Sequence, residues 1–211
     1  MYFIGVDKVY DFSKPDPNTG APLELEDSTS LYYHVNDEFM DGGDTVVNFY
    51  IVQVSGLDTQ IINSSPLVVN GSGMFFWYKP DKEDQFFEGT SKKEMKQGRK
   101  GRLQQVVRTP LSMDSHWESI DQASQQGVFA CAAIDTLLKT PAGDFHAFGV
   151  RSESVSEDNK NYRITVVVTE YYAQGTGKIQ SLTSSYVYLK NSGETRKFFD
   201  SIVSVARYWR E

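Results

Sequence analysis

Aromatic and basic residues stand close together in the middle of the chain and could bind a polyanion. The run Phe75-Phe76-Trp77-Tyr78 precedes a segment that is rich in lysine and arginine. Proteins that bind single-stranded nucleic acid combine aromatic side chains, on which bases stack, with a basic track along the phosphates. The candidate binding residues are Phe76, Tyr78, Phe86, Phe87, Lys92, Lys93, Lys96, Arg99, Lys100 and Arg102.

The overall charge weakens this interpretation. Residues 91–108 hold seven Lys and Arg against one Glu, a net +6, and the whole chain carries −7, which leaves −13 elsewhere. A surface of that sign repels nucleic acid everywhere except at the basic segment. We therefore interpret residues 92–108 as a solvated or protein-contacting loop, with single-stranded nucleic-acid binding as the alternative.

The aromatic run also has a second interpretation, as an interface. A strand sends neighbouring side chains to opposite faces, so Phe76 and Tyr78 would share one face and Phe75 and Trp77 the other. Either a further element covers the second face, or large aromatic side chains are exposed to a partner. Phe86 and Phe87, in a polar stretch, favour the second possibility.

No motif for catalysis, metal binding or cofactor binding is complete. "GTGKI" (175–179) lacks the early glycine and the Ser or Thr of a phosphate-binding loop, and it fits a hairpin turn. The three histidines, His34, His116 and His146, have no metal-ligand spacing. We expect neither cofactor nor metal. An enzyme whose catalytic groups meet only in the fold remains a second alternative.

Length and composition predict one globular domain over residues 1–211, with 39% hydrophobic residues. Cys131 is the single cysteine, and the N-terminal "MYFIGVDKVYDFSKPD" lacks a signal-peptide pattern. These features predict a cytoplasmic protein. No apolar run is long enough to span a membrane. The lack of any housekeeping-enzyme signature also fits a viral or plasmid-borne gene.

Strand patterns dominate the sequence, and several are joined by short turns. The predicted strands are residues 1–12, 30–35, 45–54, 59–70, 73–79, 103–108, 162–172 and 179–190. The last two are separated by "AQGTGK" and predict an antiparallel hairpin. In its first strand, Tyr162, Ile164, Val166 and Val168 would share one face.

Two segments predict helices. Ser115 and Glu118 have the spacing of a capping box, and apolar residues follow at helical intervals to about residue 139. The alternative is a helix ending near Gln126, with "GVFACAAIDTLLKT" as a strand that turns at "PAGD" into "FHAFGVRS". A C-terminal helix over about 193–209 is predicted from the apolar stripe Phe198, Phe199, Ile202, Val205, Ala206 and Trp209.

The sequence therefore predicts an α+β fold, with a mostly antiparallel sheet, a central helical segment (about 115–139) and a C-terminal helix (about 193–209). The function predicted is a non-enzymatic interaction or assembly subunit that presents an aromatic sheet surface and a basic loop. Its partner would be another protein or a second copy of the chain.

Overall fold

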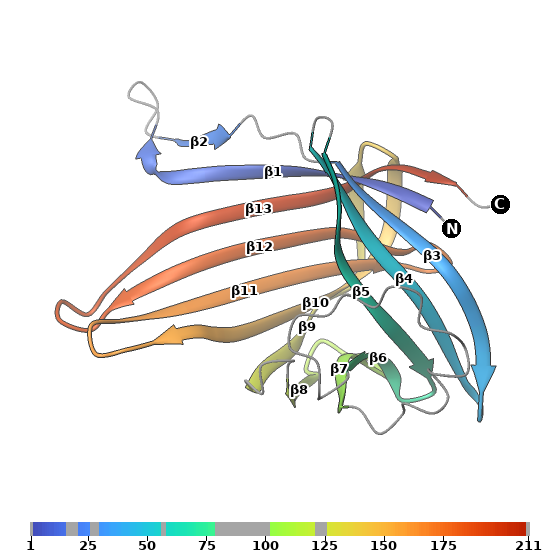
Figure 1. Ribbon diagram of the computed structural model, residues 1–211. Coiled ribbons are helices and arrows are strands. Elements are labelled where there is room, and N and C mark those ends of the chain that lie inside the picture. Colours follow the sequence, from blue (N-terminus) through green and yellow to red (C-terminus); the bar gives the residue numbers. More distant parts are fainter. Residues whose placement is uncertain are drawn as a thin grey trace.

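The computed structural model describes residues 2–15, 21–25, 30–55, 58–78, 102–120 and 126–209. These residues form thirteen strands and no helix (Figure 1). The strands are β1 (Tyr2–Pro15), β2 (Pro22–Leu25), β3 (Ser30–Asp41), β4 (Asp44–Ser55), β5 (Asp58–Asn70), β6 (Gly73–Tyr78), β7 (Arg102–Arg108), β8 (His116–Ile120), β9 (Gln126–Thr140), β10 (Gly143–Asp158), β11 (Tyr162–Ala173), β12 (Gly177–Leu189) and β13 (Glu194–Trp209).

The strands are hydrogen-bonded in one antiparallel path. Its order is β7-β6-β5-β4-β3-β1-β13-β12-β11-β10-β9-β8, and β2 pairs with β1 beside this path. Figure 1 shows the path folded into two layers, with β3–β7 crossing one end of the long hairpins formed by β10–β13. Most neighbours in the path are also neighbours in sequence, which is the arrangement that short hairpin turns produce.

The main core lies where β6 and β7 pack against β8–β11. Its buried members are Val106, Val107, Trp117, Phe129, Val150 and Tyr172. Trp117 stacks on Phe129 with ring centroids 5.7 Å apart, because the two residues lie opposite each other on β8 and β9. Tyr172 stacks on Phe148 in the same way, at 5.4 Å. These aromatic pairs fix the inner end of the long hairpins against the other layer.

Side chains of β8 join the two ends of the strand path at Gln105 of β7. The Trp117 indole donates a hydrogen bond of 3.0 Å to the Gln105 carbonyl oxygen. The Gln105 backbone N–H donates one of 2.8 Å to the Ser119 hydroxyl. Gln105 is in register with Phe75 of β6, and its backbone N–H and carbonyl oxygen both bond to side chains of β8.

The predicted α+β class is wrong, because both predicted helices are strands. Residues 115–139 contain β8 and β9, and Ser115 does not cap a helix. Its hydroxyl instead accepts a hydrogen bond from the Ser112 backbone N–H, within the loop before β8. Of the alternative for this region, the strand that turns at "PAGD" is confirmed by β9 and β10, whereas the helix ending near Gln126 is wrong, because residues 116–120 form strand β8.

The predicted C-terminal helix is strand β13. Ile202, Val203 and Val205 are β-branched, and such side chains favour strands over helices. Glu194 and Arg196 form an ion pair of 2.6 Å at a spacing of two residues. Residues two apart share a face in a strand but not in a helix, so this contact needs the extended backbone. The hairpin predicted over 162–190 is confirmed by β11 and β12.

Candidate interaction surface

The structure separates the residues that the sequence combined into one binding site. Phe76 is half-buried and packs against the main core, so it does not form an exposed stacking surface. Tyr78 and Arg102 lie opposite each other on β6 and β7, and their side chains are not described. Outside the described residues lie Phe86, Phe87, Lys92, Lys93, Lys96, Arg99 and Lys100.

The described part of the chain offers a different surface, on the long hairpins. We call residues 151–169 and 181–200, which belong to β10–β13 and their turns, the arm. Figure 1 shows the arm extending as a single layer beyond β3–β7. Consistent with a single layer, Ile164, Val166 and Val168 on one face of β11 are half-buried, and so are Thr165 and Val167 on the other.

One face of the arm continues from the main core, and we call it the inner face. Alternation along β11 places Val168 and Val166 on the same side as the core residue Tyr172. Cross-strand register then adds residues of the neighbouring strands. Within the arm, the inner face comprises Ser152, Ser154, Glu157, Tyr162, Ile164, Val166, Val168, Ser181, Thr183, Ser185, Val187, Leu189, Glu194, Arg196 and Phe199.

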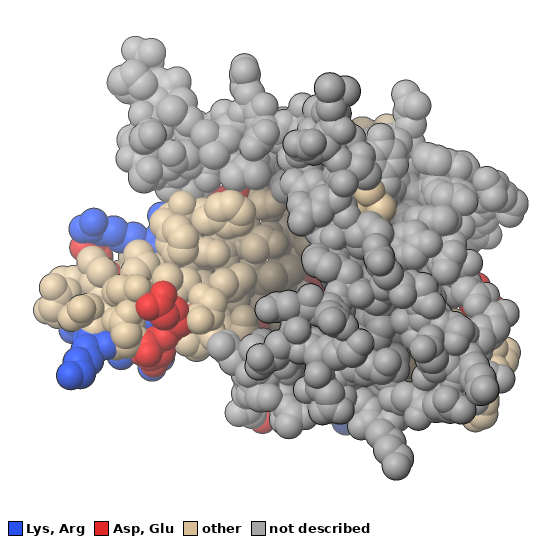
Figure 2. Space-filling view, viewed as in Figure 1, with Lys and Arg blue, Asp and Glu red and all other residues tan. Residues whose placement is uncertain are grey.

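The inner face is uncharged around Val166 and Val168 and carries Glu157, Glu194 and Arg196 toward the tip of the arm. The face is divided into columns, one for each strand. From Ile164 to Val168 the β11 column is aliphatic, and the β12 column beside it carries Thr183 and Ser185. Figure 2 shows the arm as mostly uncharged side chains, with basic residues toward its tip and a group of acidic residues on the visible face. Ser185 is 8% exposed and lies in register between Val166 and Phe199. Its hydroxyl makes no hydrogen bond to any residue that the structure describes.

A mostly buried ion pair marks the end of the inner face nearest the core. The Glu170 carboxylate accepts hydrogen bonds from the Lys178 ammonium at 2.9 Å and from the Tyr172 hydroxyl at 2.7 Å. Burial raises the pKa of the Glu170 carboxyl, but the Lys178 charge and the two hydrogen bonds outweigh it, so the pKa lies below its ordinary value. The carboxylate is therefore ionised at neutral pH.

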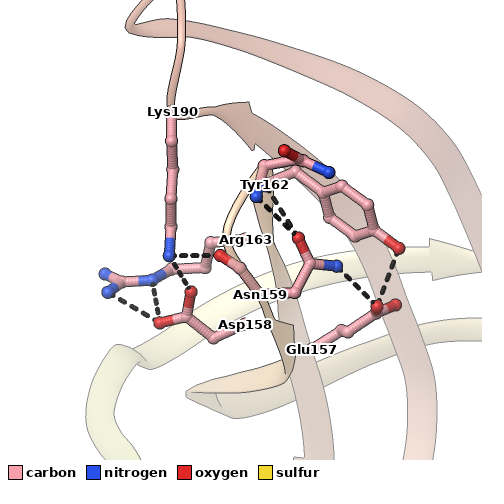
Figure 3. A network of polar contacts seen from close by, with 7 residues as sticks. Glu157, Asp158, Asn159, Tyr162, Arg163 and Lys190 are labelled. Atoms are coloured by element: carbon pink, nitrogen blue, oxygen red, sulfur yellow. Dashed lines mark hydrogen bonds and ion pairs between the residues drawn. The ribbon is translucent and has the colours of Figure 1, made fainter.

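A polar network connects the two hairpin turns at the tip of the arm (Figure 3). Asp158 accepts from Arg163 and Lys190, and these hydrogen bonds hold the pKa of its carboxyl below the ordinary range. Glu157 accepts from the Tyr162 hydroxyl at 2.7 Å, which raises the pKa of that phenol. The network fixes β12 relative to β10 and β11 where β-ladder pairing ends.

The charges of the arm and of residues 170–180, which connect its strands to the core, neutralise one another. Residues 151–200 carry seven Lys and Arg and six Asp and Glu, a net +1, whereas the chain carries −7, so the rest carries −8. Six of the seven cations form ion pairs within the segment: Arg151, Arg163, Lys178, Lys190, Arg196 and Lys197. Lys197 also lies 5.6 Å from the centre of the Tyr186 ring. This pairing leaves little charge to attract a polyanion.

Both edges of the arm are irregular. Pairing of β9 with β10 ends at Glu153, and pairing of β1 with β13 ends at Phe199, so residues 154–158 and 194–198 have no further strand partner among the described residues. A β-bulge interrupts each of these edge strands, at Ser156 and at Phe198. Bulges and edge charges hinder the addition of another strand.

Two further classes of site find no support in the described residues. They contain no group of three or more His, Cys, Asp or Glu side chains placed to hold a metal ion. Nor do they include a helix with the length and apolar character needed to cross a membrane. Cys131 is 7% exposed, and burial raises the pKa of its thiol, which keeps it protonated.

Comparisons with known proteins find two similar structures. No protein-family profile matches the chain, and no curated protein matches it in sequence. A predicted lipoprotein of Parabacteroides distasonis is 14% identical, with a TM-score of 0.46, over 97% of this chain and 94% of that one. A predicted exported protein of Bacteroides fragilis with a YmcC-like fold is 13% identical, with a TM-score of 0.44, over 98% and 95%.

The descriptions of these two proteins contradict the cytoplasmic location predicted from the sequence. One is described as a lipoprotein and the other as an exported protein. We withdraw the cytoplasmic prediction. It rested on a lone cysteine and on the N-terminal residues, and neither reports directly on where a protein is located.

Proposed function

We propose that this chain is a non-enzymatic interaction subunit that binds a protein partner on the inner face of the arm. The observation that carries the proposal is the continuity of this face with the core. This side of β11 begins under β6 and β7 at Tyr172, passes the Glu170 carboxylate that is paired with Lys178, and continues beyond β6 and β7 as Val168, Val166 and Ile164. In most folds a second layer of secondary structure covers the apolar face of a sheet. Here a partner would supply that second layer.

The partner's chemistry follows from the composition of the inner face. Aliphatic and hydroxyl side chains suit a protein surface, which can fill the spaces between Val166, Val168 and Phe199 and bond to Ser185. Nucleic acid would need free cations, but most cations of the arm are already paired. Phe76, the proposed base-stacking residue, packs against the core. We therefore favour a protein partner over a single strand.

An enzymatic role has less support from the same surface. The groups that do converge there, the Glu170 carboxylate, the Lys178 ammonium and the Tyr172 phenol, are bonded to one another. This arrangement stabilises a charge pair in a mostly buried place, and we propose no reaction for it.

Photo-cross-linking tests the proposal. A benzophenone amino acid is placed at Val168, on the inner face, or at its neighbour Val167, on the outer face, in cells that naturally make the protein. Both residues are half-buried valines on β11, so they form a matched pair. We expect a discrete protein adduct from position 168 and little from 167. Equal adducts from both positions, or none from either, would overturn the proposal.

A further inference from the structure

We infer that the partner on the inner face is a second copy of this chain, with the two arms packed face to face and antiparallel. This inference rests on the proposed function and names its partner. It follows from three properties of the arm: the columns of its inner face, the place where the covering layer ends, and the distribution of charge along the molecule.

The columns make the inner face self-complementary in one orientation. In β11 the inner residues are aliphatic, as at Val166 and Val168, whereas in β12 they include Thr183 and Ser185. A twofold axis between the sheets and perpendicular to the strands places β11 on β11 and β12 on β12. Aliphatic side chains then meet aliphatic ones, and hydroxyls meet hydroxyls. An axis parallel to the strands would instead place valines on serines.

The buried hydroxyl of Ser185 fits this orientation. A buried polar group normally has a hydrogen-bond partner, and Ser185 has none among the described residues. A hydroxyl column from a second copy can donate to it and accept from it, because each hydroxyl does both. A purely aliphatic partner would leave this group without a bond.

The antiparallel arrangement also completes the two-layer architecture. In each copy, β6 and β7 cover the inner end of the long hairpins and leave the arm as a single layer. The partner's arm would lie beside that layer and continue it along the exposed length. Both copies would gain the same cover, as a closed twofold contact requires.

The charge distribution favours the same arrangement. Residues 151–200 sum to +1, and the remainder of each chain carries −8. Antiparallel arms bring two nearly neutral segments together and hold the acidic parts at opposite ends of the dimer. A parallel arrangement would place the acidic parts side by side, where like charges repel.

The area of the inner face sets the expected affinity of the dimer. Four strands at about 4.8 Å spacing and seven residues at about 3.4 Å cover roughly 450 Å² per copy, or about 900 Å² in total. That total lies below the range of about 1,200–2,000 Å² for stable specific interfaces. We therefore expect a weak, reversible dimer with a dissociation constant in the micromolar range or above.

Sedimentation of the unmodified chain, from micromolar to near-millimolar concentration, provides the first test and should show a reversible monomer–dimer equilibrium. Val168→Glu should weaken the dimer more than tenfold, whereas the matched outer-face change Val167→Glu should leave it unaltered. Val166 is the middle of the three inner aliphatic residues of β11 in the arm, so its two copies would face each other near the twofold axis. Val166→Glu and Val166→Lys should each be monomeric alone, and an equal mixture of the two should form a dimer again.

Each result decides the inference. A chain that stays monomeric at every concentration overturns it, as does equal weakening by the changes at positions 167 and 168. If the position 168 variants do not fold, the concentration series of the unmodified chain still decides. A monomer that cross-links through position 168 to a different protein retains the proposed function and excludes the second copy. A dimer without a 168 adduct refutes the inner face in both proposals.

Discussion

The junction between β7 and β8 yields the sharpest prediction about stability. Ser119→Ala removes the acceptor of the Gln105 backbone N–H, and Trp117→Phe removes the donor to its carbonyl oxygen. An unsatisfied buried backbone group costs about 1–3 kcal/mol. Because Gln105 is only partly buried, we expect Ser119→Ala to lower the free energy of unfolding by about 1–2 kcal/mol.

Trp117→Phe should cost more, because it also removes buried ring atoms. Trp117 is 6% exposed and stacks on Phe129. The lost hydrogen bond and the space left by the smaller ring should together lower the free energy of unfolding by about 2–4 kcal/mol. Since both bonds hold Gln105, the double variant should lose less than the sum of the single ones.

Urea denaturation of the single and double variants measures these free energies. Hydrogen exchange at the Gln105 amide shows whether the loss is local. This amide should exchange faster in Ser119→Ala than in the unmodified chain. Ser156→Ala, an exposed serine of β10, is the control and should lie within about 0.5 kcal/mol of the unmodified chain. If Ser119→Ala is equally neutral and the Gln105 amide stays protected, these bonds do not join β7 to β8.

Three further predictions concern the core and the arm. Gly73→Ala should prevent folding, judged by soluble yield, because the added carbon would lie 1.8 Å from the Val107 carbonyl oxygen. Gly71→Ala, where the added carbon meets open space, should fold. Glu170→Gln keeps the shape but removes the Lys178 ion pair, and should cost about 1–3 kcal/mol in urea denaturation. The lowered pKa of Asp158 means that its contribution to stability is present at neutral pH and is lost as the pH falls below about 4. Protection of the Lys190 amide, which is bonded to Asn161, should then fall relative to an unstructured amide at the same pH.

The sequence predicted the hairpins well because their signals are local. β11 and β12 are separated by a glycine-rich turn, and their alternating residues carry the pattern of a half-buried strand. The inner-face residues of β11 could therefore be identified from alternation alone. The serine and threonine column of β12 was equally visible, but alternation does not show which of its two faces is covered.

The two helix predictions failed because intervals of three and four residues also occur in bulged strands. In β13 the bulge at Phe198 breaks the alternation and brings Phe198 and Phe199 into a helix-like stripe. In β9, Val128 is half exposed while Phe129 and Cys131 are buried, which is the alternation of a strand. Shifts in register with β10 hide this alternation further along.

The aromatic site could not be judged from sequence because its two interpretations differ only in what covers β6. Phe76 contacts the core because β7–β11, which lie far along the chain, pack over it. The arm could not be predicted at all, since its exposure depends on where another layer ends. That boundary is a property of tertiary packing and has no local sequence signal.

Addition of a strand at an edge is the other way in which a sheet can bind a partner, and the arm is poorly suited to it. The edge of β10 bears a bulge followed by Glu157 and Asp158, which the tip network holds in place. The edge of β13 bears its own bulge, next to Lys197. A strand that added there would meet interrupted backbone donors and acceptors and would have to displace fixed charges. The part of the inner face around Val166 and Val168 carries neither a bulge nor a charge. A partner of the arm is therefore expected to pack on this face rather than extend the sheet.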